Sequence, residues 1–428
     1  MRENIDLLIQ PFLDQGYIQC ATVAILHGNQ PSVFSYHRAA STETFLPDGD
    51  TLFEIGSITK LFTLLLLGDM VKDGLIALDA PLSVFLPAIP ELGVGQKGLI
   101  TIRHLLWHKA GWRDPAIDWR NPQTFTRQQR DAFLAACPLQ SAPGAQAAYS
   151  NMGYGLLGNI LAQVAGTDYF QLLQQRIFHP LGMCDTVLTL SPQQRARLAQ
   201  GHLADGTCTP AQHLDNDSPL LACGHLKSTA NDMLIFMQAW VNWQTSAIGS
   251  IFEAAEKQLG WSDNVNGVMV QGGKTFGYLC YMFLDRSREC GRLVLGDTST
   301  FYVVSLCNAI GDLVEGGKYT PVALPQLLHA PFTGDPKWIG HYQIPADRIF
   351  SDWNTLEIRR DHGEWSMIGR SEQVIKESSK NLKPLSPTSF DLKGLDIEIV
   401  FENAHVKLLP GPTAKSMLFS EPIICQRI

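Results

Sequence analysis

The sequence lacks a long hydrophobic run, a leader-like start and a cluster of basic residues. Its longest apolar stretch, residues 61–67, is too short to cross a bilayer, since a spanning helix needs about 20 apolar residues. No basic segment followed by an apolar one stands at the start, so we expect a cytoplasmic protein, or a periplasmic or secreted one if a leader has been removed. Lys and Arg number 33 against 41 Asp and Glu, and nucleic acid is therefore not an expected partner.

Cysteine is present, but not in a pattern that indicates disulfides or metal. The chain has 9 cysteines, an odd number, at irregular spacing and without a Cys-x-x-Cys pair, which favours reduced thiols. The 428 residues are 45% hydrophobic and 17% charged, as in ordinary globular proteins. The length allows two or three domains.

The chain begins and ends its first large region with strand-like segments. Residues 21–34 read as two strands joined by a turn at Gly28. A helix is expected after Ser57, to about Val71, and the region from about 80 to 225 is mostly helices and loops. A further helix is expected over residues 230–241. The later strands are expected at residues 265–270, 278–284, 292–295 and 301–306. We therefore predict one antiparallel sheet, built from both ends of this region, with a helical lobe inserted.

The last part of the chain has a different pattern. A linker is expected near residues 326–337, which contain Pro331, Gly334 and Pro336. Beyond it, apolar and polar residues alternate, for example at residues 356–359, 395–399 and 406–408, which is typical of strands with one solvated face. We predict a small all-β barrel over residues 338–428.

Ser57 and Lys60 form the first motif that suggests chemistry. Residues three apart share one face of a helix, so the hydroxyl and the amine can meet. A serine is a weak nucleophile that needs an adjacent base, and a helix start favours its alkoxide. The alternative is a helix-capping serine with an exposed lysine one turn later.

Tyr149 and Asn151 form a second motif, after Pro143 and Gly144. Two residues apart in an extended turn, their side chains can point the same way. A phenolate beside a lysine ammonium can take the proton of a serine and later return it. The alternative is a tyrosine that only packs on a helix start.

Together these motifs resemble the superfamily of class C β-lactamases and D-alanyl-D-alanine carboxypeptidases, with its esterase and aminopeptidase branches. The similar stretches recur in the family's order over roughly residues 1–325, at residues 52–60, 102–106, 143–158, 180–183 and 226–230. The resemblance implies an α/β (α+β) domain over residues 1–328, with a sheet from about 1–50 and 229–325, a helical lobe at about 60–225, and the active site in the seam. It also implies Ser57 as nucleophile, Lys60 and Tyr149 as general base and acid, and Asn151 as a hydrogen-bonding residue.

The family's third motif has two possible registers here. Lys274-Thr275 matches the letters, but Phe276 replaces the usual glycine. We prefer the register that places Gln271 at the position of the usual Lys or His, followed by Gly273, because it matches the family's spacing to the Gly277-Tyr278 step. The glycines there also make physical sense, since bare backbone lets a substrate approach closely. The backbone N–H groups of Ser57 and Lys274 then form the oxyanion hole. A neutral glutamine cannot pair with a substrate carboxylate, which favours an uncharged ester or amide.

The expected function is that of a serine hydrolase acting on an ester, a peptide-like amide or a β-lactam through an acyl-enzyme. Acyl transfer to an alcohol and a non-catalytic scaffold or ligand-binding protein are the alternatives. A small-molecule or peptide-like substrate is expected, with no cofactor and no metal, and the oligomeric state stays open. Residues 338–428 resemble the lipocalin-like domain found behind some family members.

Three further signals have simpler explanations. Gly153, Gly155 and Gly158 match the dinucleotide fingerprint in letters but lack its strand and acidic residue, so we expect close helix packing. His104 and His108 have the spacing of metal ligands, yet no Glu accompanies them, and we expect structural histidines. Trp107 and Trp112 are candidates for either the pocket or the core.

Overall fold

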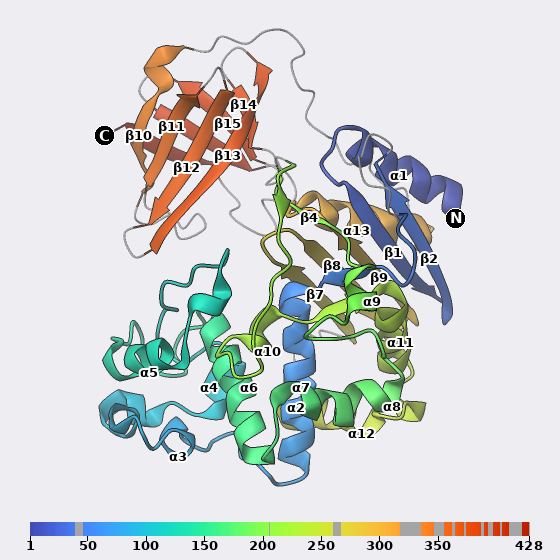
Figure 1. Cartoon of the computed structure of the whole chain (residues 1–428), viewed down its shortest axis with the longest axis vertical. Coiled ribbons are helices and arrows are strands. Elements are labelled where there is room, and N and C mark those ends of the chain that lie inside the picture. The colour runs from blue at the N-terminus through green and yellow to red at the C-terminus, as the bar shows by residue number, and fades with distance from the viewer. Residues whose placement is uncertain are drawn as a thin grey trace.

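A computed structural model of the chain gives the arrangement in Figure 1. The structure describes residues 1–38, 46–204, 206–259, 267–316, 335–345, 355–361, 364–371, 374–386, 389–392, 397–402, 405–410 and 422–427.

A five-stranded antiparallel sheet is the centre of the first region. Its strand order is β2-β1-β9-β8-β7. The strands are β1 (Cys20–His27), β2 (Gln30–His37), β7 (Val268–Lys274), β8 (Leu279–Asp285) and β9 (Cys290–Gly296). Two strands thus come from the start of the chain and three from the far side of the helical insertion, which confirms the predicted fold class.

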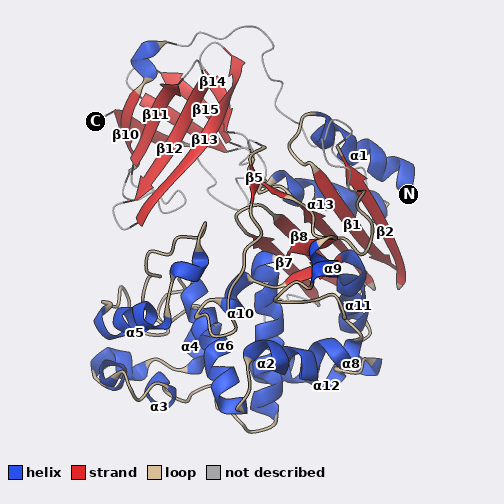
Figure 2. Cartoon of the chain, viewed as in Figure 1, coloured by secondary structure: helices blue, strands red, loops and turns tan. Residues whose placement is uncertain are grey.

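Both faces of the sheet are covered by helices (Figures 1 and 2). Successive side chains of a strand point to opposite faces, and β1 is buried along nearly its whole length. Val23 packs with α1 (Arg2–Asp14) and α13 (Tyr302–Val314) on one face, while Leu26 packs into the larger core on the other. That second face carries α11 (Ala230–Val241).

The helical lobe begins after the short strand β3 (Leu52–Glu54). Its elements are α2 (Thr59–Lys72), α3 (Leu82–Phe85), α4 (Ile102–Leu106), α5 (Arg127–Ala136), α6 (Asn151–Ala165), α7 (Tyr169–Leu173), α8 (His179–Leu181), α9 (Pro192–Arg195), α10 (Leu221–Gly224) and, later, α12 (Gly249–Leu259). The short strands are β3 (Leu52–Glu54), β4 (Gly201–His202), β5 (Cys208–Thr209) and β6 (Lys227–Thr229). Helix α2 is buried almost all round, because it packs against α12, α10 and α6.

One predicted strand is wrong. Residues 301–306 were expected to be a strand, but Phe301 caps α13 and the other five residues form the start of that helix. The apolar residues Val303, Leu306, Cys307 and Ile310 recur with a helical spacing, and a short apolar run does not distinguish a strand from a buried helix. The predicted strand at 265–270 is β7 from Val268 onward, and its first residues lie outside those described.

The C-terminal region is a closed antiparallel barrel, which confirms the predicted all-β barrel. Its strands are β10 (Gly340–Gln343), β11 (Thr355–Asp361), β12 (Glu364–Ser371), β13 (Val374–Ser386), β14 (Ser389–Leu392), β15 (Ile397–Glu402), β16 (His405–Pro410) and β17 (Ile423–Arg427). Alternate side chains, such as Val406 and Leu408, fill a separate core, against which Phe301 also packs. The lipocalin-like resemblance and the domain boundaries stay predictions. Most of the predicted linker, with Pro331 and Gly334, lies outside the described residues.

Within the described parts of the chain, no helix has both the length and the apolar character needed to cross a membrane.

Candidate active site

Ser57 lies in a tight turn between a buried strand and the central helix of the lobe. The turn is a short 3₁₀ helix over Gly56–Ile58, and α2 follows at once. Lys60 stands in the first turn of α2, so its side chain returns to the serine, as the spacing predicts. The Lys60 Nζ donates a hydrogen bond of 3.0 Å to the Ser57 Oγ.

The Lys60 ammonium is surrounded by acceptors. Besides Ser57, it donates to the Asn151 Oδ1 at 2.8 Å and to the carbonyl oxygen of Cys223. An ammonium has three N–H donors and no acceptor, and three acceptors therefore use all of them. The side chain is only 4% exposed, so these bonds replace its hydration. Lys60 fits this position as a cation.

Tyr149 completes the group around the serine. Its hydroxyl lies 2.7 Å from the Ser57 Oγ, and the Lys60 Nζ lies 4.9 Å from the centre of its ring. The side chain is 57% exposed, so this face of the group is open to incoming molecules. Asn151 is the first residue of α6 rather than part of an extended turn, because Ser150 caps that helix.

Asp114 fixes the segment that carries Tyr149 and Asn151. Its carboxylate accepts hydrogen bonds from the backbone N–H groups of Asn151 at 2.7 Å and Met152 at 3.1 Å, and from the Ser150 hydroxyl. The two backbone N–H groups are orphan donors of a helix start, and a carboxylate there also interacts favourably with the helix dipole. Burial raises the pKa of Asp114. Sequence reasoning missed this residue, because 36 positions separate it from Ser150 and no local motif marks it.

His108 supports the same segment from the other side. Its ring lies 4.6 Å from the ring of Tyr149, with 37° between the planes, and its Nδ1 accepts a bond of 3.1 Å from the backbone N–H of Ser150. Burial, and secondarily the charge of Lys60, lowers the pKa of His108 to about 4. A neutral imidazole thus packs on the tyrosine. The residue was expected to be structural, and its position next to Tyr149 was not foreseen.

His104 serves local structure instead. Its Nδ1 accepts a bond of 3.1 Å from the backbone N–H of Thr101 at the start of α4. Among the residues that the structure describes, no group of three His, Cys, Asp or Glu side chains is placed to hold a metal.

The glycines of the dinucleotide-like motif are buried in α6. A Cβ at Gly155 would lie 2.0 Å from the carbonyl oxygen of Pro219, and one at Gly158 would lie 2.2 Å from the Cβ of Ala222. The glycines therefore allow close helix packing.

The edge strand β7 forms the opposite wall, and two glycines let it approach. Gly56 has φ of +51°, and a Cβ there would lie 2.5 Å from the backbone N of Lys274. A Cβ at Gly273 would lie 1.9 Å from the carbonyl oxygen of Ile55. Neither position tolerates a side chain, since real Cβ atoms essentially never come so close. The backbone of β7 is thereby held against the turn that carries Ser57.

The side chains of β7 lie around this contact. The Gln271 amide donates to the carbonyl oxygen of Gly272 at 2.9 Å, and its nitrogen lies 3.5 Å from the carbonyl oxygen of Ser57. The Lys274 ammonium lies 4.7 Å from the centre of the Phe301 ring. Gln271, Gly273 and Lys274 thus all adjoin the serine turn, Gln271 with a neutral side chain.

A cavity of about 310 Å³ opens beside the serine. It is lined by Ser57, Trp119, Asn151, Gln212, Cys223, Gly224, His225, Lys274, Thr275 and Phe276. Trp107 and Trp112 are absent from this lining and pack in or against the large core instead. The pocket aromatics are Trp119 and Phe276, which the sequence did not single out.

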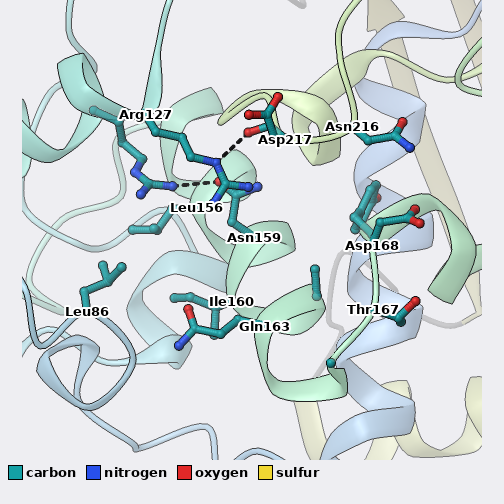
Figure 3. A pocket seen from close by; sticks show the side chains of 14 residues that line it. Leu86, Arg127, Leu156, Asn159, Ile160, Gln163, Thr167, Asp168, Asn216 and Asp217 are labelled. Carbon is teal, nitrogen blue, oxygen red and sulfur yellow. Dashed lines mark hydrogen bonds between the residues drawn. The ribbon is translucent and has the colours of Figure 1, made fainter.

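A larger hollow of about 500 Å³ lies elsewhere, along α5 and α6 (Figure 3). Ser57, Lys60 and Tyr149 do not line it. Its Arg127 donates to the carbonyl oxygen of Asp217, and Arg130 donates to Asn159 at 2.8 Å, so both guanidinium groups are engaged within the protein. The reactive group therefore belongs to the smaller cavity.

Residues 5–294 match the model of the beta-lactamase family. The D-alanyl-D-alanine-carboxypeptidase/endopeptidase AmpH of Escherichia coli (strain K12) is 31% identical over 344 residues, which cover 71% of this chain and 86% of that protein. Penicillin-binding protein 4* of Bacillus subtilis (strain 168) is 26% identical over 440 residues, with 94% of this chain and 93% of that protein covered.

Solved structures show the same fold. A class C beta lactamase from Rhodobacter sphaeroides superposes with a TM-score of 0.59 at 21% identity, over 69% of this chain and 93% of that one. The D-alanine carboxypeptidase AmpC from Burkholderia cenocepacia gives a TM-score of 0.58 at 23% identity, with the same coverage of 69% and 93%.

Proposed function

Because the chain belongs to the beta-lactamase family, we propose that it is a serine hydrolase that forms an acyl-enzyme on Ser57. One observation carries the proposal: the Ser57 Oγ lies between the Lys60 Nζ at 3.0 Å and the Tyr149 hydroxyl at 2.7 Å. A nucleophile needs a base within hydrogen-bond reach, and the base needs a group that orients it. Both requirements are met here.

In the acylation step, Tyr149 reacts as the phenolate, its own proton having been released to water across its exposed face. The Ser57 Oγ attacks the carbonyl carbon of the substrate, and its proton passes to the phenolate oxygen of Tyr149. The Lys60 cation, whose N–H groups are all directed at acceptors, does not take that proton; it offsets the negative charge of the phenolate instead. When the tetrahedral intermediate collapses, the bond to the leaving alcohol or amine breaks, and Tyr149 gives the proton to that leaving group.

Deacylation runs through the same groups in reverse roles. Water attacks the acyl carbon while Tyr149 takes one of its protons. The bond to the Ser57 Oγ then breaks, and the proton returns to the serine. The exposed face of Tyr149 gives water access to this position.

The negative charge on the carbonyl oxygen needs N–H donors during both steps. We assign the backbone N–H groups of Ser57 and Lys274 to this role. The close contact of Gly56 with the backbone N of Lys274 supports the assignment, since it brings the two chain segments together.

The side chain of Gln271 indicates which class of substrate the site accepts. It occupies the strand wall beside the carbonyl of Ser57, and its amide cannot form an ion pair. We therefore propose an uncharged ester or peptide-like amide as the substrate, in preference to a β-lactam or peptide that is recognised by its carboxylate.

Incubation with p-nitrophenyl butyrate and, separately, with a fluorescent penicillin tests the proposal. We expect release of p-nitrophenol and a mass increase of one acyl group on the folded protein. Ser57→Ala is expected to lose both, by about 10³-fold or more in turnover. An added alcohol that appears in the product identifies acyl transfer rather than hydrolysis.

The contradicting result is equally clear. If folded protein gives neither an adduct nor turnover with either compound, the non-catalytic alternative replaces the hydrolase. Folding is checked by a cooperative thermal transition in both proteins.

A further inference from the structure

A contact between the helical lobe and the sheet lies beside the cavity at Ser57. The Arg120 guanidinium lies 5.1 Å from the centre of the Phe276 ring. Arg120 belongs to the segment between α4 and α5, and Phe276 to the turn between β7 and β8. Trp119 and Phe276 both line the cavity, so the contact joins two of its walls.

Trp119 is held in place through Gln212. The Gln212 side-chain amide donates to the carbonyl oxygen of Trp119 at 2.7 Å, while its backbone N–H donates to the Glu54 carboxylate at 2.7 Å. The buried Lys227 ammonium donates to the carbonyl oxygen of Gln212 at 2.8 Å. The aromatic wall is thus tied to the buried side chains of Glu54 and Lys227.

The two segments that meet are themselves rigid turns. Asp118 accepts from the backbone N–H of Arg120 at 3.0 Å and from the side chain of Asn121 at 2.9 Å. On the other side, the backbone N–H of Thr275 bonds to the carbonyl oxygen of Tyr278 at 3.0 Å. A pocket whose walls are already fixed loses little entropy when a ligand binds.

The lining gives the chemistry of the ligand. Trp119 and Phe276 offer flat apolar surfaces, and Asn151 and Gln212 offer neutral amides. Lys274 also lines the cavity, but its ammonium lies 4.7 Å from the centre of the Phe301 ring, which is outside the lining. A volume of about 310 Å³ is at the small end of ligand pockets, which span roughly 300–1,000 Å³. This description fits a compact, uncharged group with a flat apolar part.

We propose that the cavity binds a compact, uncharged aromatic acyl group between Trp119 and Phe276, and that the Arg120–Phe276 contact sets the size limit of the substrate. The inference rests on the proposed acyl-enzyme function and adds the substrate class. It predicts hydrolysis of small arylacyl esters in preference to acetyl or long-chain esters.

The test compares kcat/KM for the p-nitrophenyl esters of acetate, phenylacetate and decanoate. Wild type is expected to prefer phenylacetate over acetate by about tenfold, the value of one well-placed aromatic contact. Phe276→Ala and Trp119→Leu should each reduce this ratio to near one. Arg120→Ala should raise the decanoate-to-phenylacetate ratio of kcat/KM about threefold to fivefold, since it removes the cation–π contact between Arg120 and Phe276.

Arg113→Ala is the matched control, because Arg113 is exposed and outside the cavity lining. It should keep both wild-type ratios. A wild-type phenylacetate-to-acetate ratio near one, or ratios that stay unchanged in the Phe276, Trp119 and Arg120 variants, overturns this inference while leaving the hydrolase intact. Absence of any acylation of Ser57 in folded wild type overturns the proposed function instead.

Discussion

The two walls of the cleft are built differently. The helical wall is formed by the starts of α2 and α6 and the segments just before them. In it, the Ser57 Oγ lies 2.7 Å from the Tyr149 hydroxyl and 3.0 Å from the Lys60 Nζ, which in turn lies 2.8 Å from the Asn151 Oδ1. The strand wall, β7, approaches through glycine backbone and carries the neutral amide of Gln271. In the proposed mechanism, the first wall moves protons, and the second places the carbonyl oxygen and selects the substrate. Each wall can therefore be changed separately.

After Ser57→Ala, removal of the Tyr149 hydroxyl should have the largest effect. Tyr149→Phe deletes the group 2.7 Å from the Ser57 Oγ, and general acid–base catalysis is worth about 10²- to 10⁴-fold. We expect a loss of that size in kcat for an activated ester. Steady-state kinetics measure it.

Tyr154→Phe is the control for this change. Tyr154 lies on α6, which begins two residues after Tyr149, and it also contacts His108, but its hydroxyl donates to the carbonyl oxygen of Leu106 at 3.2 Å. It should keep the wild-type rate. Equal losses in the two variants would mean that Tyr149 acts only through packing.

On the strand wall, Gly273→Ala should come next. The added Cβ would lie 1.9 Å from the carbonyl oxygen of Ile55, so β7 must move away from the serine turn. Overpacking of this kind costs about 1–3 kcal/mol of unfolding free energy. We expect lower stability by chemical denaturation together with a lower kcat, since the oxyanion hole widens.

Gly272→Ala is the matched control on the next residue. Its Cβ would lie 3.4 Å from the ring of Tyr281, an ordinary contact. A similar loss in both variants would show that the close approach at Gly273 is not what matters.

His108→Gln should lower kcat about tenfold without a matching change in KM. The variant removes the ring that packs on Tyr149 at 4.6 Å, and a small misplacement of a catalytic group is costly. If the variant changes only the stability or only KM, His108 has a structural role and does not position Tyr149 for catalysis.

The same variant should alter the pH dependence of stability. His108 has a folded-state pKa of about 4 against an ordinary 6.5, so the unfolded chain binds more protons between these values. Its contribution is present above pH 6.5 and is lost as the pH falls to 4, by at most about 1.4 kcal/mol per pH unit. His108→Gln should show a flatter decline in this window. His225, whose pKa burial lowers to about 3, retains part of the slope in both proteins.

Gln271→Lys should have the smallest effect on the basal reaction and the clearest effect on selection. A lysine introduces a cation on the strand wall, and we expect up to about tenfold better kcat/KM for an ester with a distal carboxylate. An uncharged ester of the same size is the comparison. An unchanged ratio would contradict the assignment of Gln271 to the third-motif position.

The sequence predicted the sheet and the helical wall because both depend on local patterns. The spacing of Ser57 and Lys60 on one helix and the motif at Tyr149 and Asn151 are readable in the letters, as is the alternation in the barrel. The run at 301–306 was predicted as a strand and is part of a helix, because a short apolar run looks the same in a buried strand and in a buried helix.

The residues that support the site could not be predicted from the sequence, for a different reason. Asp114 meets Ser150 across 36 positions, and Gln212 meets Glu54 across 158, so only the folded chain brings them together. Trp119 and Phe276 likewise come from distant loops. Such contacts leave no periodicity or motif in the sequence.

The most direct test of the central claim is the site of the acyl group. After rapid quenching of the reaction with an activated ester, proteolysis and mass spectrometry locate the modified residue. The account predicts a single acylated peptide that contains Ser57, and no such peptide from Ser57→Ala. An acyl group on another residue, or an identical adduct in the variant, would contradict it.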